Sequence, residues 1–256
     1  MRDLHRRLQV LEKNLPFPVL SCKEHDLAEV LCDVLLASKR SLHICTINAE
    51  IAHCFMTSSR SQKALQYVSY FVPDGIGVEL AYKFLFGADA GKLPGIEFSE
   101  ELLKECALRS WNVALYGATK GRVLDAASYL TNKYPPLSIS AVLDGYSDSD
   151  DLRVFLRKCQ DESVRLVLVA LGHPAQDEFI SKYFGSLSAI WVGVGGSFDV
   201  WSGAKRRSPR LFSWIGLEWL YRILQDPSPQ RLKRSLALPA FCLDMIFFRL
   251  GLYRHP

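Results

Sequence analysis

The stretch Tyr67-Val68-Ser69-Tyr70-Phe71-Val72-Pro73-Asp74-Gly75-Ile76-Gly77 contains the pattern on which the fold prediction rests. Its first part is apolar, β-branched and aromatic, which is typical of a buried strand, and it stops at Pro73-Asp74-Gly75. Apolar residues at helical spacing begin at Ile76. The pattern therefore predicts a strand, a tight turn and a helix, with the carboxylate of Asp74 where the strand ends.

Asp74 has two interpretations. Asp-Gly is common in turns and aspartate caps helices well, so a purely structural role would explain the residue. Alternatively, open α/β sheets bind ligands beyond the carboxyl ends of their strands, where an aspartate can act as a general base. The pattern around Asp74 leaves both interpretations open.

Runs of the same character recur along the chain and alternate with segments of helical spacing. The predicted strands span residues 41–45, 66–72, 111–116, 137–142, 165–170 and 189–194. Helical spacing covers residues 28–35, 102–107 behind Ser99 as a candidate N-cap, 123–129, 152–159 and 179–183. This alternation predicts an α/β fold, with a Rossmann-like, largely parallel sheet flanked by helices.

Length and composition predict a globular protein with a sizeable core. The chain has 256 residues, of which 49% are hydrophobic and 23% are charged. The alternation stops near Lys205, where basic, aromatic and proline-containing sequence begins. We therefore expect an α/β catalytic core over residues 1–204 and a helical, basic and amphipathic C-terminal appendage over residues 205–256.

Cysteine usage and hydropathy predict a cytoplasmic protein. The 7 cysteines show no C-x-x-C spacing and lie mostly in apolar segments, so we expect buried thiols in a reducing compartment. The N-terminus lacks the apolar region of a signal peptide. No stretch reaches the length of about 18 uncharged apolar residues that a membrane-spanning helix needs.

Charge distribution favours an anionic partner other than a nucleic acid. Basic residues crowd the last fifth of the chain, which favours binding to something anionic. The net charge is only +4, and basic and aromatic residues do not alternate there. Both features argue against nucleic-acid binding.

Polar or glycine-rich residues follow each predicted strand. Because parallel strands end at the same edge of a sheet, these loops should converge on one site. Glycine, Asn and Asp also end strands for steric reasons, so each loop alone is weak support, whereas six together favour a site. The residues concerned are Thr46 and Asn48, Asp74, Gly117, Asp144, His173 and Gln176, and Gly195, Gly196 and Asp199.

Two patterns point to ligand classes without deciding them. Gly117 to Gly121 resembles a turn that binds phosphate at a helix N-terminus, although neither G-x-G-x-x-G nor a Walker sequence is present. A nucleoside diphosphate bound in another way remains compatible. Asp148-Ser149-Asp150 could bridge a metal to a diphosphate, but it precedes a helical segment, where aspartate is expected as a cap.

We expect no metal and no cofactor, because histidine and cysteine lack the spacing of metal ligands. His173 is a candidate base by residue type, but no partner for it is evident in the sequence. A role as an ordinary loop residue is the simpler interpretation of His173.

Considered together, the loops resemble those of the WecG/TagA/CpsF family of bacterial glycosyltransferases. The resemblance runs from about residue 40 to about residue 235. It is carried by Thr46-x-Asn48, Pro73-Asp74-Gly75-x-Gly77, Leu93-Pro94-Gly95, Gly172-x-Pro174-x-Gln176, Gly193-Val194-Gly195-Gly196-Ser197-Phe198-Asp199, Arg207-Ser208-Pro209 and Leu217-Glu218-Trp219-Leu220-Tyr221-Arg222.

The resemblance implies an enzyme of polysaccharide or wall-polymer biosynthesis. Such an enzyme moves a hexose or N-acetylhexosamine-type sugar from a UDP-sugar, with inversion, onto a sugar carried by a polyprenyl diphosphate. It implies metal-independent transfer by a peripheral protein on the cytoplasmic face of the inner membrane. The alternative is a non-catalytic UDP-sugar-binding or scaffold protein of the same pathway.

The resemblance also assigns site residues. It makes Asp74 the base and places Thr46 and Asn48 beside it in the catalytic set. Donor binding is expected from Gln176, Gly195, Gly196 and Asp199, with Gly117 added from its phosphate-type turn, and from appendage arginines that close over the diphosphate, for which Arg222, Arg231 and Arg234 are the candidates. The alternative for Arg231 and Arg234 is contact with anionic lipid alone. Lys92 stands where many relatives carry arginine and is expected to contact the acceptor or the diphosphate.

Departures from the family pattern leave some assignments open. Asp177 replaces the usual Glu, and Ser208 replaces Ala. The segment at residues 227–230 is about two residues longer than the family spacing, which leaves open which arginine takes each family position.

The apolar segment 241–250 favours a membrane contact, with a protomer interface as the alternative. The sequence leaves open the donor and acceptor sugars, the linkage, the polymer and the oligomeric state.

Overall fold

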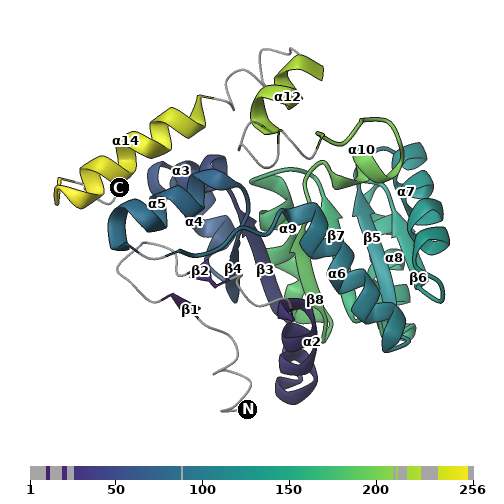
Figure 1. Ribbon diagram of the computed structural model, residues 1–256. Helices are drawn as coiled ribbons and strands as arrows, with labels where there is room; N and C mark the ends of the chain where they lie inside the picture. The colour runs from purple at the N-terminus through teal and green to yellow at the C-terminus, as the bar shows by residue number, and fades with distance from the viewer. Residues whose placement is uncertain are drawn as a thin grey trace.

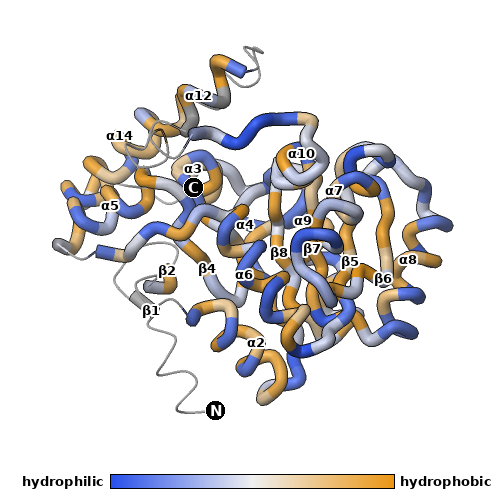
Figure 2. The backbone as a smooth tube through the Cα atoms, turned by 45° about the vertical axis from the view of Figure 1, so that its right-hand side comes forward, coloured by the Kyte–Doolittle hydropathy of each residue, from blue (hydrophilic) through white to orange (hydrophobic). Residues whose placement is uncertain are grey.

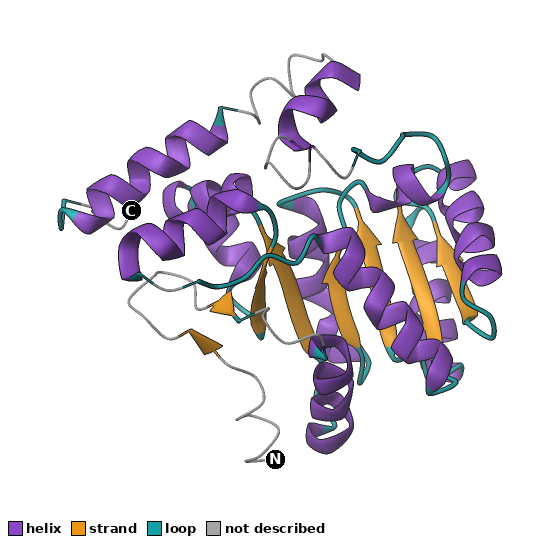
Figure 3. Cartoon of the chain, in the orientation of Figure 1, coloured by secondary structure: helices purple, strands orange, loops and turns teal. Residues whose placement is uncertain are grey.

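The computed structural model describes residues 10–11, 19–21, 26–87, 89–209, 212, 218–225 and 236–252. It contains an eight-stranded sheet with helices on both faces (Figures 1 and 3). The strand order is β1-β2-β4-β3-β8-β7-β5-β6. Strands β2 to β8 pair in parallel, and β1 pairs antiparallel with β2 at one edge. The predicted Rossmann-like, largely parallel α/β fold is therefore confirmed.

The strands are β1 (Val10–Leu11), β2 (Val19–Leu20), β3 (Leu42–Ile47), β4 (Tyr70–Pro73), β5 (Asn112–Gly117), β6 (Ser138–Leu143), β7 (Leu166–Ala170) and β8 (Ile190–Gly193). The helices are α2 (Leu27–Ser38), α3 (Ala49–Thr57), α4 (Ser59–Leu65), α5 (Ile76–Phe86), α6 (Gly95–Leu108), α7 (Lys120–Lys133), α8 (Ser149–Asp161), α9 (Ala175–Tyr183), α10 (Ser197–Trp201), α12 (Glu218–Gln225) and α14 (Ala237–Arg249). A short 3₁₀ helix, η1 (Phe184–Ser186), follows α9.

Successive side chains of the central strands point to opposite faces of the sheet, as strand geometry requires. Ile44 of β3 joins the apolar cluster under α2, α6, α7 and α10, which we call the first face. Cys45 packs with α3, α5 and α14 on the second face. On β8, Val192 joins the first face and Trp191 packs with α8 and α9 on the second. Figure 2 accordingly shows mostly hydrophobic strands.

Five of the six predicted strands match observed strands within two residues, but the predicted strand at residues 66–72 begins too early. Its first residues form the turn that follows α4, where the backbone amide of the C-cap residue Gln66 donates to Lys63 O. Tyr67 is exposed and stacks on Phe184 instead of entering the sheet. The apolar and aromatic run therefore contained a turn that residue type alone did not indicate.

The N-cap predicted at Ser99 is wrong. Helix α6 begins at Gly95 directly after Pro94, and Ser99 lies inside the helix with its hydroxyl donating to Gly95 O at 2.7 Å. Proline fixes its own φ, and this favours a helix start at that point. By contrast, Asp148 caps α8, because its Oδ1 accepts from the amides of Asp150 and Asp151.

The prediction of buried thiols is confirmed for Cys32, Cys45, Cys106 and Cys159, which are free and buried. Burial raises the pKa of the Cys32 and Cys159 thiols to about 12. Cys54 is half-buried and Cys242 is exposed, so the prediction does not hold for them. Cys22 lies outside the described residues.

Helix α14 lies across α3 and α5 (Figure 1). Phe241 and Met245 are buried in the cluster of the second face, and each such burial contributes about 2 kcal/mol. His53 Nδ1 lies 2.6 Å from Asp244 Oδ2, which joins α3 to α14. The proposed boundary at residue 204 stays a prediction.

The outer side of α14 is apolar. Leu243, Ile246, Phe247 and Leu250 are 43% to 63% exposed. Arg249 Nη1 donates to Phe84 O at 2.6 Å and its guanidinium lies 4.5 Å from the Phe84 ring centre. None of the helices in the described part of the chain combines the length and the apolarity needed to cross a membrane.

Candidate functional site

The neighbouring strands β3 and β8 send the chain to opposite faces of the sheet. The loop after β3 leads to α3 on the second face, whereas the loop after β8 leads to α10 on the first. Such a switch point leaves a crevice at the carboxyl edge, which is where open α/β sheets bind ligands. A pocket occupies this place, lined by the loops after β3, β4, β7 and β8, the start of α6 and residues 205–208.

Asp74 and Thr46 converge at the wall of this pocket. The Asp74 amide donates to Ile47 O at 2.9 Å, which ties the end of β4 to β3. Gly75 then turns the chain with φ +83°, a conformation that L side chains rarely adopt. A Cβ at Gly95 would lie 3.0 Å from Thr46 Oγ1 and 3.4 Å from Asp74 Oδ2. The start of α6 therefore closes against both side chains.

Asn48 caps α3 at the edge of the pocket. Its Oδ1 accepts from the Ile51 amide at 3.0 Å, and its own backbone is extended as N-caps require. Thr46, two residues earlier, is buried, and its hydroxyl lies 3.4 Å from Gly193 O. The loop after β3 is thus attached both to its own helix and to β8.

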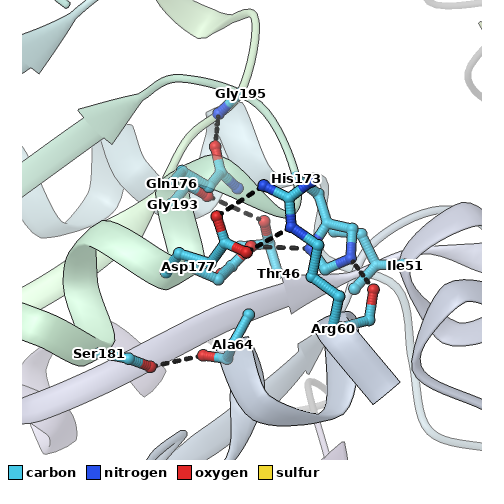
Figure 4. A network of polar contacts seen from close by, with 12 residues as sticks. Thr46, Ile51, Arg60, Ala64, His173, Gln176, Asp177, Ser181, Gly193 and Gly195 are labelled. Atoms are coloured by element: carbon cyan, nitrogen blue, oxygen red, sulfur yellow. Dashed lines mark hydrogen bonds and ion pairs between the residues drawn. The ribbon is translucent and has the colours of Figure 1, made fainter. Parts of the chain in front are cut away.

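Gln176 organises the end of β8 (Figure 4). Its side chain is buried, and its Oε1 accepts from the Gly195 amide at 3.0 Å. A Cβ at Gly193 would lie 2.4 Å from Gln176 Nε2, so only glycine leaves room for this amide. Gly196, next along the loop, also lines the pocket.

Asp199, at the pocket, forms ion pairs with two basic side chains. Its Oδ1 accepts from Arg122 Nη1 at 2.7 Å, and its Oδ2 lies 3.0 Å from Lys205 Nζ. Lys205 lines the pocket, whereas Arg122 belongs to α7. Asp199 therefore fixes the start of the basic segment Lys205-Arg206-Arg207.

The basic segment was missed as part of the site. Arg206 and Arg207 line the pocket beside Lys205. Arg207 Nη2 pairs with Glu97 Oε1 of α6, and Gln225 of α12 donates to Arg206 O at 2.9 Å. The run of three basic residues was visible in the sequence, but it was read as the beginning of the appendage.

Gly117 and Lys92 do not line the pocket. Gly117 has φ +120°, and a Cβ there would lie 2.5 Å from Ala170 O. The Ala118 amide donates to the same carbonyl at 2.9 Å, so it is not available to a phosphate. The glycine is explained by the close approach of β5 to β7. Lys92 lies in the loop between α5 and α6.

The appendage arginines cannot be placed at the pocket. Arg222 belongs to α12, and its side chain lies outside the described residues. Arg231 and Arg234 lie outside the described residues altogether. Their assignment to the diphosphate therefore stays a prediction.

His173 has the partners that the sequence did not reveal (Figure 4). Its Nδ1 lies 2.8 Å from Asp177 Oδ2 and its Nε2 lies 2.8 Å from Ser61 Oγ. Asp177 Oδ1 faces His43 Nε2 at 3.5 Å. Burial raises the pKa of Asp177, but the two imidazoles outweigh it and hold that pKa below its usual value. The i, i+4 spacing of His173 and Asp177 at the start of α9 was the available signal.

Within the described residues, no three His, Cys, Asp or Glu side chains are grouped so that they could hold a metal ion. The polar groups that line the pocket are the carboxylates of Asp74, Glu50 and Asp199, hydroxyl and amide groups such as those of Thr46 and Gln176, the imidazole of His173, and the basic residues Lys205, Arg206 and Arg207. This set can take a proton and can bind an anion.

The sequence model of the Glycosyl transferase WecG/TagA/CpsF family matches residues 13–255. This chain belongs to that family. Three relatives carry the name N-acetylglucosaminyldiphosphoundecaprenol N-acetyl-beta-D-mannosaminyltransferase. They come from Bacillus spizizenii W23 (33% identical, 80% of this chain and 79% of the relative), Bacillus subtilis 168 (31%, 79% and 78%) and Staphylococcus aureus MW2 (35%, 80% and 79%).

Proposed function

We propose that this WecG/TagA/CpsF family member transfers a sugar, with inversion, from a UDP-sugar to a sugar carried by a polyprenyl diphosphate. The observation that carries the proposal is the convergence of Asp74, Thr46 and the basic segment 205–207 on one pocket. An inverting transfer needs a base for the acceptor hydroxyl and cations for the departing diphosphate. The pocket offers both.

Asp74 is the proposed base. It is only partly buried, it stands at the end of β4, and its backbone is fixed to β3 through Ile47 O. Thr46 and Asn48 shape the wall next to it. In this assignment the acceptor hydroxyl loses its proton to Asp74 as its oxygen attacks the anomeric carbon, and the bond from that carbon to the UDP oxygen breaks.

The leaving diphosphate is assigned to Lys205 and Arg206. Both line the pocket, and their backbone is held by Asp199 and Gln225 respectively. Arg206, together with Lys205 once its ammonium is shared between Asp199 and the phosphate oxygens, can bind the diphosphate without a divalent cation, which makes the transfer metal-independent in this proposal. Arg222, Arg231 and Arg234 remain further candidates for the same contact.

The names of the relatives support the nature of both substrates. Those proteins are named for transferring N-acetylmannosamine to N-acetylglucosaminyl-diphosphoundecaprenol. We therefore propose a lipid-linked N-acetylglucosamine acceptor and rank UDP-N-acetylmannosamine first among donors. The exposed apolar side of α14 supports a peripheral position on the cytoplasmic face of the membrane that holds such an acceptor.

The test is turnover of a panel of UDP-sugars with a short-chain lipid-diphosphate acceptor, using the wild-type chain and Asp74→Asn. We expect the variant to bind UDP as the wild type does but to lose turnover by about 10³-fold or more, because the base is missing. Asp144→Asn is the matched control, since Asp144 follows β6 at the same edge of the sheet outside the pocket. A wild-type chain that binds UDP and never transfers sugar would instead be a binding or scaffold protein.

A further inference from the structure

A buried polar chain beside the pocket has no role in the proposed transfer chemistry. It runs from Ser61 of α4 through His173 to Asp177 of α9, and Figure 4 shows His173 beside Asp177. Both ring nitrogens of His173 take part, with each contact at 2.8 Å. Because neither nitrogen is left for a substrate, His173 is poorly placed to act as a base, although it lines the pocket.

The burial of this chain makes its contacts costly to break. The side chains of His173 and Asp177 are 5% and 1% exposed. A buried carboxylate is costly unless donors surround it, and here His173 Nδ1 bonds Oδ2, whereas Oδ1 has no hydrogen-bond partner among the described residues and only faces His43 Nε2 of β3 at 3.5 Å. Asp177 therefore ties the first turn of α9 to the loop after β7 by a hydrogen bond, and it lies against β3 only through the longer contact with His43.

Gln176 immediately precedes Asp177 in the chain. The backbone amide of Gln176 donates to Gly172 O at 2.9 Å, and its side-chain Oε1 accepts from the backbone amide of Gly195. A shift of the first turn of α9 would carry the side chain of Gln176 away from Gly195. The position of the loop after β8 thus depends on the link between His173 and Asp177.

We infer that the bond between His173 and Asp177 holds Gln176 on Gly195, with Ser61 as a secondary contact of the imidazole, and that His173 is thereby a positioning residue for donor binding. The inference rests on the proposed function, because it assumes that the donor occupies the loops after β7 and β8. Asp74 is fixed separately through Ile47 O, so this bond acts on donor affinity and leaves the proton transfer intact.

Two substitutions of His173 each remove one of its hydrogen bonds and keep the other. In His173→Asn the amide nitrogen falls where Nδ1 stood, so the bond to Asp177 is kept and the bond to Ser61 is lost. In His173→Gln the amide reaches the position of Nε2, so the bond to Ser61 is kept and the bond to Asp177 is lost. We expect His173→Gln to raise the donor KM about tenfold with kcat changed less than about threefold, and His173→Asn to stay within about threefold of the wild type for both.

Arg60→Gln is the matched control. Arg60 also links α4 to α9, through Glu178 Oε1 at 2.5 Å, but this pair lies at the surface and does not touch Gln176. Ser61→Ala removes only the partner of Nε2, so we expect it to stay within about threefold of the wild type, as His173→Asn does. The Gly195 amide resonance of ¹⁵N-glycine-labelled protein reports the bond to Gln176 directly, and we expect it to move in His173→Gln and to stay in place in Arg60→Gln.

Each outcome supports or overturns the inference. A donor KM for His173→Gln equal to that of the wild type, or a lower Tm with an unchanged KM and an unmoved Gly195 resonance, would reduce His173 to a packing residue. Equal losses in His173→Asn and His173→Gln would show that the bond to Asp177 is not the decisive contact. A wild-type chain without UDP binding or turnover would overturn the proposed function instead, and that result is distinguishable before any variant is made.

Discussion

The Cα atom of Gly193 lies against the side-chain amide of Gln176, so closely that a Cβ at position 193 would fall 2.4 Å from Nε2. This contact joins β8 to α9 at the floor of the pocket. It also explains why the last residue of β8 is a glycine although its backbone conformation is ordinary.

Gly193→Ala should displace Gln176 and disturb the pocket. We expect the free energy of unfolding to fall by about 1–3 kcal/mol, as in other overpacked sites, and the affinity for UDP to fall with it. Gly185→Ala is the control, because a Cβ there meets nothing within 4 Å. Unchanged UDP binding by Gly193→Ala, measured calorimetrically, would contradict the role assigned to Gln176.

Arg206→Gln should weaken nucleotide binding because it removes a positive charge from the pocket. Arg206 lines the pocket, and its backbone is fixed by Gln225, so the substitution removes the guanidinium without releasing the segment. We expect the Kd for UDP to rise about tenfold and its salt dependence to decrease. Arg153→Gln, on the exposed side of α8, should leave both quantities unchanged. Equal Kd values for the two variants would rule out the diphosphate contact.

Phe247→Ser together with Leu243→Ser should reduce binding to vesicles of anionic phospholipid. Both residues lie on the exposed apolar side of α14, whereas Phe241 and Met245, which attach the helix, are untouched. We expect co-flotation to fall severalfold while turnover of a soluble short-chain acceptor is retained. Leu108→Ser, at a site that is 79% exposed on α6, is the control. Full co-flotation of the double variant would place the membrane contact elsewhere.

Glu100→Gln should destabilise the protein in a manner that depends on pH. Burial raises the pKa of Glu100, but hydrogen bonds from Lys133, Tyr134 and Trp201 outweigh it and hold that pKa below its usual value. A lowered folded-state pKa means that the stabilisation is complete above the unfolded-state pKa of about 4.3 and is lost as the pH falls through the folded value.

Urea unfolding at several pH values provides the measurement. At pH 7 we expect the variant to lose about 1–3 kcal/mol, and the difference from the wild type should shrink below about pH 4. The exposed Glu29 on α2 is the control position, where glutamine should change little at any pH. A difference that is independent of pH would contradict the assignment.

The parts of the fold that residue type determines locally were predictable. Buried strands such as β7, with five apolar residues in succession, stood out, and so did the polar residues at their ends. Strand β2 did not, because it is two residues long and pairs with β4 through a single position. The helix start at Gly95 was hidden by a serine in a plausible capping place.

The site was predictable where single loops carry it and unpredictable where distant segments meet. Thr46, Asp74 and Gln176 belong to the ends of strands or the loops after them, and all three line the pocket as expected, whereas their roles stay predictions. The contact of His173 with Ser61 joins residues 112 positions apart, so no local pattern could reveal it. Gly117 was predicted to lie in a phosphate-binding turn, but it does not line the pocket, and a glycine required by neighbouring backbone looks the same in sequence as one required by a ligand.

The packing of α14 has a consequence for truncated forms of this protein. Phe241 and Met245 pack with apolar side chains of α3 and α5, in the same cluster as Cys45 and Ile47. A fragment that stops before residue 236 would expose the apolar side chains that these two residues cover. Self-association of such a fragment would then report the missing helix, and it should not be taken as the natural oligomeric state.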